Sequence, residues 1–230
     1  MNLEDLKRDA GEEAARQVES GMRLGLGTGS TVRYFLEALG RRLAHNELSD
    51  VVGVPTSLAT ERLAKTLSIP LTTLSSVPEL DLCVDGADEV DPQLNLIKGM
   101  GGALLREKIV AAVSGRLVII ADQTKVVDSL GEKSPLPVEV LPFGWKPTAA
   151  MVRNLGATLE LRKQGREVVM TDQSNFILDC RFPDLARDPR HVARSLEALP
   201  GVLGHGLFLG MADEAIIAAE GGVQRMTAAR

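Results

Sequence analysis

The stretch from Leu82 to Val113 constrains the fold of this chain most strongly. It begins as an apolar strand, runs directly into four acidic residues, passes through a loop with three glycines and enters a helix near Ala103. In open α/β sheets, ligands bind in the crevice at the carboxyl ends of strands, which is where these acids would lie. The pattern therefore indicates an α/β fold with a polar site after this strand. The alternative interpretation is a solvated acidic turn.

The four acids after the strand are Asp85, Asp88, Glu89 and Asp91. Carboxylates crowded in this way raise one another's pKa unless a cation, a metal or a ligand compensates their charge. Asp85 and Asp88 are three positions apart, which departs from the D-x-D spacing of aspartyl-phosphate enzymes. An EF-hand calcium loop does not fit either, because Gly86 directly follows the first acid. The spacing therefore argues against a metal-dependent phosphatase and predicts a site without a metal.

The helix after the glycine loop carries Arg106, Glu107 and Lys108 in succession. Every residue three or four positions from Glu107 is apolar, so no cation of the same helix pairs with it. An unpaired carboxylate among apolar side chains has a raised pKa, as a general base working near neutral pH requires. Arg106 and Lys108 have almost the same apolar neighbours, so the spacing leaves open which of the three charges faces the site.

A second glycine-rich loop, residues 25–31, joins an early strand to a helix. It is not the dinucleotide fingerprint, because Ser30 occupies the place of the third glycine, and no Gly-Lys-Ser/Thr follows as in a Walker A loop. The loop offers backbone N–H groups at a helix N-terminus together with the hydroxyls of Thr28, Ser30 and Thr31. Such a helix N-terminus suits a phosphate monoester. The alternative is a tight turn with a helix cap.

The first part of the chain alternates strands and helices, as expected for a doubly wound sheet. The predicted strands are 22–27, 50–55, 69–74, 80–84 and 116–122, and the helices between them are 32–43, 56–68 and one from about 103. The strand at 116–122 is apolar almost throughout, which is typical of a strand covered by helices on both faces. Polar residues follow the strands near Gly27, Asp85 and Ala121, and we expect these three strand ends to converge on one pocket.

The pattern changes near Gly131, where a segment rich in turn residues begins. The order that follows is strand, helix, two strands, helix and strand, which matches the ferredoxin-like split unit. Its predicted strands are 137–142, 157–163 and 175–182, its helices are 148–156 and 190–201, and the tail supplies a last strand and a strand returning to the first domain. We therefore expect a Rossmann-like, doubly wound, mostly parallel catalytic domain, 1–130 plus about 207–230, and a smaller ferredoxin-like α+β lid domain, 131–206. His205, in a glycine-rich turn, is interpreted as structural.

The composition of the chain excludes several classes of binding partner. A net charge of -5 and an aromatic content of 3% argue against nucleic acid and anionic membranes. Cys83 and Cys180 lie in apolar strand-like runs and are interpreted as buried hydrophobes, too few for a disulfide framework or a cysteine-based zinc site. No apolar run approaches eighteen residues, and the charged N-terminal helix lacks the apolar core of a signal peptide. We expect a soluble cytoplasmic protein.

Five motifs together resemble ribose-5-phosphate isomerase, type A. They are GLGTGST at 25–31, VDGADEVD at 84–91, IKGMGGALLREKIVA at 97–111, ADQTKVVD at 121–128 and PLPVEV at 135–140. Each motif is weak alone, but they follow the family's order and spacing over essentially the whole chain. The resemblance implies interconversion of ribose 5-phosphate and ribulose 5-phosphate, with a small sugar phosphate as ligand and without a metal or organic cofactor. It also implies a homo-oligomer, a dimer or a tetramer.

The resemblance also assigns roles to residues. It makes Glu107 the general base, Asp85 and Asp88 the ring-opening and hydroxyl-binding acids, and Lys98 the cation that stabilises the developing oxyanion. The implied substrate contacts are Lys7, Thr28, Gly29, Ser30, Thr31, Gly86, Ala87, Gly99, Met100, Gly101 and Lys125. Glycine is more common in the family at the position of Met100, where only the backbone N–H should be needed, and the resemblance leaves open whether the Met100 side chain narrows the pocket.

The rival function is a sugar-phosphate sensor of related fold that binds without turnover. Such regulators normally carry a DNA-binding domain, and we expect none here, because the segment before Met22 is too short to form one.

Overall fold

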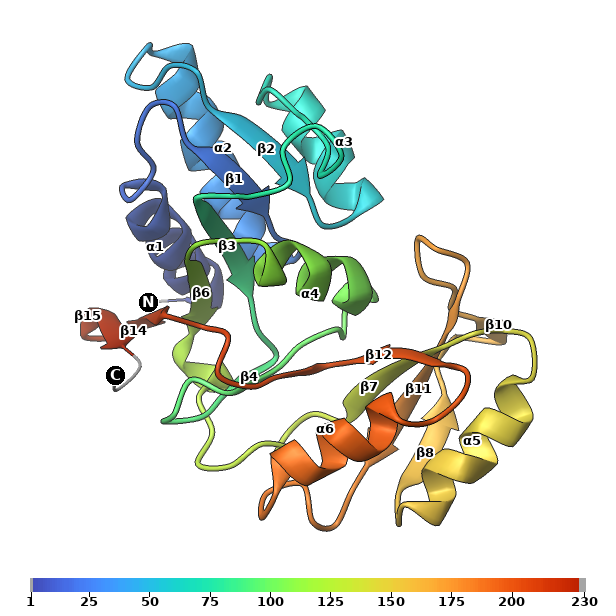
Figure 1. Ribbon diagram of the computed structural model, residues 1–230. Coiled ribbons are helices and arrows are strands. Elements are labelled where there is room, and N and C mark those ends of the chain that lie inside the picture. The colour runs from blue at the N-terminus through green and yellow to red at the C-terminus, as the bar shows by residue number, and fades with distance from the viewer. Residues whose placement is uncertain (1, 228–230) are drawn as a thin grey trace.

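The computed structural model describes residues 2–227, and its largest sheet has six strands in the order β15-β14-β6-β3-β1-β2 (Figure 1). The strands are β1 (Arg23–Leu26), β2 (Val52–Pro55), β3 (Leu82–Gly86), β6 (Leu117–Asp122), β14 (Glu214–Ala219) and β15 (Gly222–Thr227). All neighbouring pairs are parallel except β14 with β15. The order of the parallel strands reverses between β1 and β3, which creates a topological switch point there. The predicted mostly parallel sheet is confirmed.

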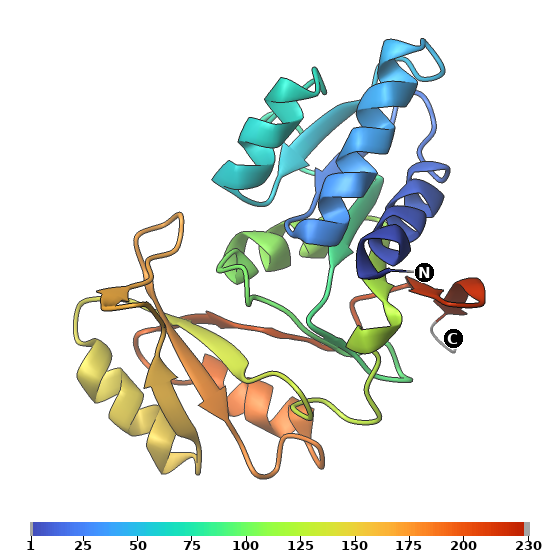
Figure 2. The ribbon, with the colours of Figure 1, turned by 180° about the vertical axis from the view of Figure 1, so that it is seen from behind.

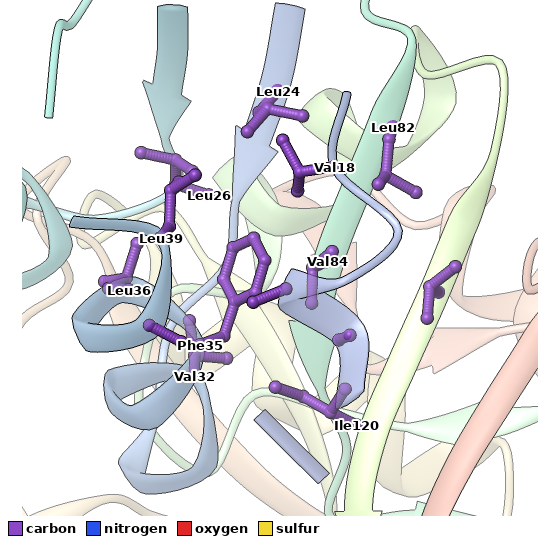
Figure 3. Packing of buried hydrophobic residues seen from close by; sticks show 14 of the residues in the cluster. Val18, Leu24, Leu26, Val32, Phe35, Leu36, Leu39, Leu82, Val84 and Ile120 are labelled. Carbon is purple, nitrogen blue, oxygen red and sulfur yellow. The ribbon is translucent and has the colours of Figure 1, made fainter. Parts of the chain in front are cut away.

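Helices cover both faces of this sheet, and alternate residues of each strand supply the two cores. The helices are α1 (Leu3–Ala15), α2 (Ser30–Ala44), α3 (Leu58–Thr66) and α4 (Leu104–Ala112). Leu24, Leu82 and Val84 pack against α1 and α2, with the Phe35 ring of α2 among them (Figure 3). Cys83, between Leu82 and Val84, points to the other face, toward α4. Because helices cover both faces of the sheet, its central strands are buried on both sides, which explains why a strand such as β6 is apolar almost throughout.

A second, antiparallel sheet has the order β12-β7-β11-β8. Its elements are β7 (Leu136–Val140), α5 (Trp145–Asn154), β8 (Thr158–Leu161), β11 (Phe176–Arg181), α6 (Pro189–Glu197) and β12 (Val202–His205). Figure 2 shows α5 and α6 beside this sheet, away from the larger one. The predicted β-α-β-β-α-β order is confirmed. A small hairpin of β9 (Lys163–Gln164) and β10 (Glu167–Val168) inside it was not predicted.

The segments that connect the longer elements form a third, small sheet of three two-residue strands. Its order is β13-β5-β4, with β4 (Glu89–Val90), β5 (Leu96–Ile97) and β13 (Leu207–Phe208). The backbone passes so close here that a Cβ atom on Gly206 would lie 2.1 Å from the carbonyl oxygen of Lys98. The chain leaving β12 is therefore packed directly against the segment that carries Lys98.

The predicted strand at 69–74 is wrong. Only Leu71 forms a bridge, with Gly53, and a turn begins at Thr73, where Ser76 N donates to the Thr73 carbonyl. Pro70 lacks an N–H donor, and the early turn leaves too few residues for a ladder. The prediction for the two cysteines is confirmed, since both thiols are free and buried. None of the described helices is long and apolar enough to cross a membrane.

Candidate active site

The three strand ends that were expected to converge do surround one cavity. It has a volume of about 200 Å³ and lies at the carboxyl ends of β1, β3 and β6, at the switch point of the sheet. Its walls come from the loop before α2, the segment after β3, the glycine loop after β5, one residue of α4, the segment after β6 and the start of α1. The lining residues are Leu3, Lys7, Thr28, Gly29, Ser30, Thr31, Val32, Gly86, Ala87, Asp88, Lys98, Gly99, Gly101, Glu107, Asp122, Thr124 and Lys125.

A buried lysine contacts two buried carboxylates at the inner end of this cavity. Lys98 Nζ lies 3.1 Å from Asp85 Oδ2 and 3.4 Å from Glu107 Oε1, and it donates to the Gly86 carbonyl at 2.5 Å. Burial alone would lower the pKa of Lys98, but the charges of the two carboxylates outweigh it and raise that pKa. Lys98 is therefore held as a cation next to the cavity.

Glu107 has the properties of a general base. Burial, reinforced by the negative charge of Asp85, raises the pKa of Glu107 to about 8, although Lys98 opposes the shift. Its Oε2 atom is buried and has no hydrogen-bond partner among residues 2–227. A buried acceptor without a partner costs free energy. Because no protein donor occupies this oxygen, it is free to take a proton from a molecule in the cavity.

The structure also shows which of the three successive charges faces the site. Glu107 lines the cavity. Arg106 points away and donates from Nη2 to the Pro55 carbonyl at 3.0 Å. Lys108 points away as well and donates to the carbonyls of His205 and Leu207 at 2.7 and 2.9 Å. The two cations thus fix α4 to backbone on either side, and His205 is buried outside the cavity.

Asp85 and Asp88 occupy different positions around the site. Asp85 is buried behind the cavity, where its Oδ1 accepts from Thr28 N at 3.0 Å and from Gly86 N at 2.7 Å. Asp88 lines the cavity, and its Oδ2 accepts from Met100 N at 3.0 Å. Asp85 is thus placed to hold Lys98, whereas Asp88 is placed to meet a ligand.

The Met100 side chain does not narrow the pocket. Its side chain is 42% exposed and does not line the cavity. The reason lies in the backbone: the Met100 N–H is bound by Asp88, and the Met100 carbonyl accepts from Arg162 Nη1 at 3.0 Å. These contacts turn the side chain outward.

The outer end of the cavity begins at α2. Gly29, with φ of +133°, forms the cap of this helix without a side-chain hydrogen bond, so the first N–H groups of α2 have no side-chain cap. Ser30 and Thr31 line the cavity here together with Lys125 and Lys7, and Lys7 also pairs with Glu4 at 2.8 Å. An uncapped helix N-terminus flanked by cations suits an anion.

The hydroxyl of Thr28 is engaged elsewhere. Its Oγ1 lies 2.7 Å from Thr56 Oγ1, 2.8 Å from Ser57 Oγ and 3.1 Å from Thr60 Oγ1. Thr56 and Ser57 directly precede α3, Thr60 lies in its first turn, and Ser57 caps the helix. Thr28 therefore lines the cavity while its hydroxyl fixes the loop to α3.

Two lining residues of the segment after β6 were not assigned a role from the sequence. Asp122 is buried at the end of β6 and accepts from Thr124 N at 2.9 Å, which shapes the short η1 helix (Gln123–Lys125). Their position at a strand end was the only signal, and it does not distinguish a ligand contact from a turn. Among residues 2–227, no group of three or more His, Cys, Asp or Glu side chains is arranged to hold a metal ion.

The fold and the cavity together define a class of protein. This is an α/β protein with its binding cavity at the topological switch point, where a lysine–carboxylate cluster occupies one end and a helix N-terminus the other. The family of ribose 5-phosphate isomerase A (phosphoriboisomerase A) matches residues 52–222, and the chain belongs to this family.

Relatives match over almost the full length of the chain. Ribose-5-phosphate isomerase A from Roseiflexus sp. (strain RS-1) is 53% identical over 223 residues, covering 96% of this chain and 95% of that protein. A solved D-ribose-5-phosphate isomerase in complex with phospho-erythronic acid has a TM-score of 0.95 at 43% identity, covering 99% of this chain and 100% of that one. Ribose 5-phosphate isomerase from Plasmodium falciparum has a TM-score of 0.94 at 39% identity, covering 97% and 98%. The family and fold class predicted from the sequence are confirmed.

Proposed function

We propose that this chain is an aldose–ketose isomerase that interconverts D-ribose 5-phosphate and D-ribulose 5-phosphate. The family supports the reaction class. The observation that carries the proposal is the unpartnered, buried Oε2 of Glu107 beside the Lys98 ammonium, in a cavity that ends at the N-terminus of α2. A related isomerase was solved with phospho-erythronic acid, which carries an acid group and a phosphate, the two kinds of group that these ends suit.

The reaction moves one proton between neighbouring carbons. In the open-chain sugar, Glu107 takes the proton from C2 and the electron pair shifts to give an enediolate. Returning this proton to C1, while the hydroxyl proton of O2 passes to O1, leaves the carbonyl at C2 with no net gain or loss of atoms. One carboxylate can serve both steps when it lies over both carbons. A pKa of about 8 suits both proton removal and proton return near neutral pH.

The enediolate carries a negative charge that must be stabilised. Lys98 and the backbone N–H groups of Gly99 and Gly101 are the proposed donors, because the Met100 N–H is bound by Asp88. Such preorganised donors are typically worth about 3–4 kcal/mol each to the transition state. Asp88, in the cavity wall, is proposed to accept sugar hydroxyls and to assist ring opening, while Asp85 holds Lys98 in place.

The phosphate is proposed to bind at the other end of the cavity. Ser30 and Thr31, at the N-terminus of α2, are the proposed donors of N–H and hydroxyl groups, with Lys125 and Lys7 as cations. Holding the phosphate fixes the reacting carbons beneath Glu107 and lends binding energy to the chemical step. Gly86 and Ala87 form the wall between the two ends.

The proposal is tested by assaying purified protein for ketose formation from ribose 5-phosphate. We expect turnover, and we expect exhaustive dialysis against EDTA to leave it intact, because the acids of the cavity are committed to Lys98 and to backbone N–H groups. Binding of the sugar phosphate without ketose formation would instead identify a sensor. Loss of activity that a divalent ion restores would overturn the proposed roles of Asp85 and Asp88.

We further propose that the enzyme is a cytoplasmic homodimer. For the domains we propose a catalytic unit of 1–130 plus about 207–230, of which 228–230 lie outside the described residues, and a lid of 131–206. The two large sheets, each with its own core, support this division. Light scattering on the purified protein measures the assembly.

A further inference from the structure

Arg162 links the second sheet to the glycine loop of the active site. It follows β8 directly, and its backbone N–H donates to the Ile177 carbonyl of β11 at 2.8 Å. Its side chain is only 10% exposed and does not line the cavity. Arg162 therefore reaches the loop from outside the cavity, and its backbone is anchored to β11.

All parts of the guanidinium group are engaged. Nε donates to Asp179 Oδ2 at 2.9 Å, and Nη2 pairs with Asp179 Oδ1. Nη1 donates to the carbonyls of Gly99 and Met100, at 2.8 and 3.0 Å, and Nη2 lies 3.6 Å from Met100 Sδ. The donors of arginine form a rigid planar fork. Asp179 therefore fixes the orientation of the fork, and the fork fixes two consecutive carbonyls.

Fixing these carbonyls also fixes two N–H groups. In a trans peptide the C=O and the following N–H point in opposite directions, and residues 2–227 contain no cis peptide bond. The Gly99 carbonyl thus sets the direction of the Met100 N–H, which donates to Asp88 at 3.0 Å. The Met100 carbonyl sets the direction of the Gly101 N–H, for which the described chain provides no hydrogen-bond partner. Gly101 lines the cavity, and its N–H points away from Arg162, because the Met100 carbonyl of the same peptide points toward Arg162.

We propose that Arg162 is a positioning residue for the isomerisation: it holds the Gly99–Met100–Gly101 peptides so that the Gly101 N–H meets the enediolate oxygen and Asp88 remains in the cavity wall. This inference rests on the proposed function. Arg162 comes from the four-stranded sheet, whereas the loop follows β5. The donor is therefore oriented only when these two parts of the molecule are docked against each other.

The test is Arg162→Lys, which keeps the charge but cannot hold both carbonyls and both oxygens of Asp179. Removing one such donor lowers the rate by about 10²–10³-fold. Misaligning the donor without removing it should lower the rate less, by about 10–100-fold. We expect kcat to fall by this factor with KM within about threefold of wild type. The dissociation constant of phospho-erythronate should rise with the fall in kcat, because its planar carboxylate imitates the enediolate. Asp179→Asn, which frees the arginine instead of replacing it, should show the same pattern.

Arg166→Lys is the matched control, since Arg166 is exposed in the turn between β9 and β10, four residues further along the chain, and it should behave as wild type. The inference is overturned if kcat of the folded Arg162→Lys protein stays within about twofold of wild type. It is also overturned if KM and the phospho-erythronate constant rise by the same factor, because general loosening of the loop would do that. Absence of turnover in the wild-type protein would refute the proposed function itself.

Discussion

Lys98, Asp85 and Glu107 form a buried cluster with two carboxylates and one ammonium. The sequence indicated that Glu107 lacks a helical partner, and the structure agrees, because its contacts come from outside α4. The sequence could not show which of Arg106, Glu107 and Lys108 faces inward, since their neighbours along the helix are alike. That choice depends on Pro55 and Leu207, whose carbonyls bind the two cations.

The raised pKa of Glu107 predicts the pH dependence of the reaction. A general base must be unprotonated, and the carboxyl of Glu107 loses its proton only as the pH rises through about 8. We therefore expect kcat/KM to rise with pH through this region and then to level off. Initial rates with ribose 5-phosphate from about pH 6 to about pH 10 measure this profile. A profile already flat across that range would mean that Glu107 ionises like an ordinary glutamate or is not the base.

Lys125 is predicted to matter only for phosphorylated substrate. Lys125→Ala should lower kcat/KM for ribose 5-phosphate by about 10–100-fold, because a hydrogen bond to a charged group contributes about 1.5–3 kcal/mol. The slow reaction of free ribose should hardly change. Lys163→Ala removes an exposed lysine elsewhere and serves as the control. Equal losses on both sugars would place Lys125 outside the phosphate site.

At the scale of elements, the apolar runs and their flanking turns predicted most of the long strands and helices, but the six-residue edge strand β15 of the larger sheet was not predicted. The two-residue strands β4, β5 and β13 were not predicted. Such short strands show no periodicity, and β13 pairs with β5 across more than a hundred residues of chain. Their absence from the prediction matters for the site, because β5 leads directly to Lys98 and the glycine loop.

The close approach of β1 to β3 gives a prediction at this scale. A Cβ atom on Gly27 would lie 2.3 Å from Asp85 Oδ1 and 2.6 Å from Asp85 Cα. Gly27→Ala should therefore destabilise the fold by about 1–3 kcal/mol, as overpacking does, and should displace Asp85 and reduce turnover. Gly86→Ala is the stability control, since its Cβ would have no neighbour nearer than 3.7 Å. Urea unfolding measures both, and equal stabilities would contradict the predicted clash.

At the scale of the whole molecule, the change of pattern near Gly131 was enough to separate the two sheets. How they dock was not predictable, because the contacts join residues distant in sequence and carry no local pattern. Asp172 Oδ2 accepts from the Leu58 N–H at the start of α3 at 2.7 Å. Arg162, which follows β8 of the four-stranded sheet, likewise reaches across to the first unit and donates to the Gly99 carbonyl of the glycine loop. Most cavity residues were therefore found from motifs, whereas Arg162 and Asp172, which join the two parts of the molecule, were found only in the structure.

The central claim is that Glu107 carries the proton, and Glu107→Gln tests it most directly. The amide keeps the shape of the side chain but cannot take the C2 proton. We expect kcat for ribose 5-phosphate to fall by about 10²–10⁴, the usual worth of a positioned acid–base group. Affinity for the sugar phosphate, measured by titration, should change much less, because Lys98 and the start of α2 remain. Glu61→Gln, on the surface of α3, is the control and should keep wild-type turnover.

This single comparison of kcat between Glu107→Gln and wild type decides the account. The predicted result is a folded variant that binds ribose 5-phosphate but turns it over at least about 10²-fold more slowly than wild type. A folded variant that retains more than about a tenth of wild-type kcat would contradict it and would remove Glu107 from the role of base.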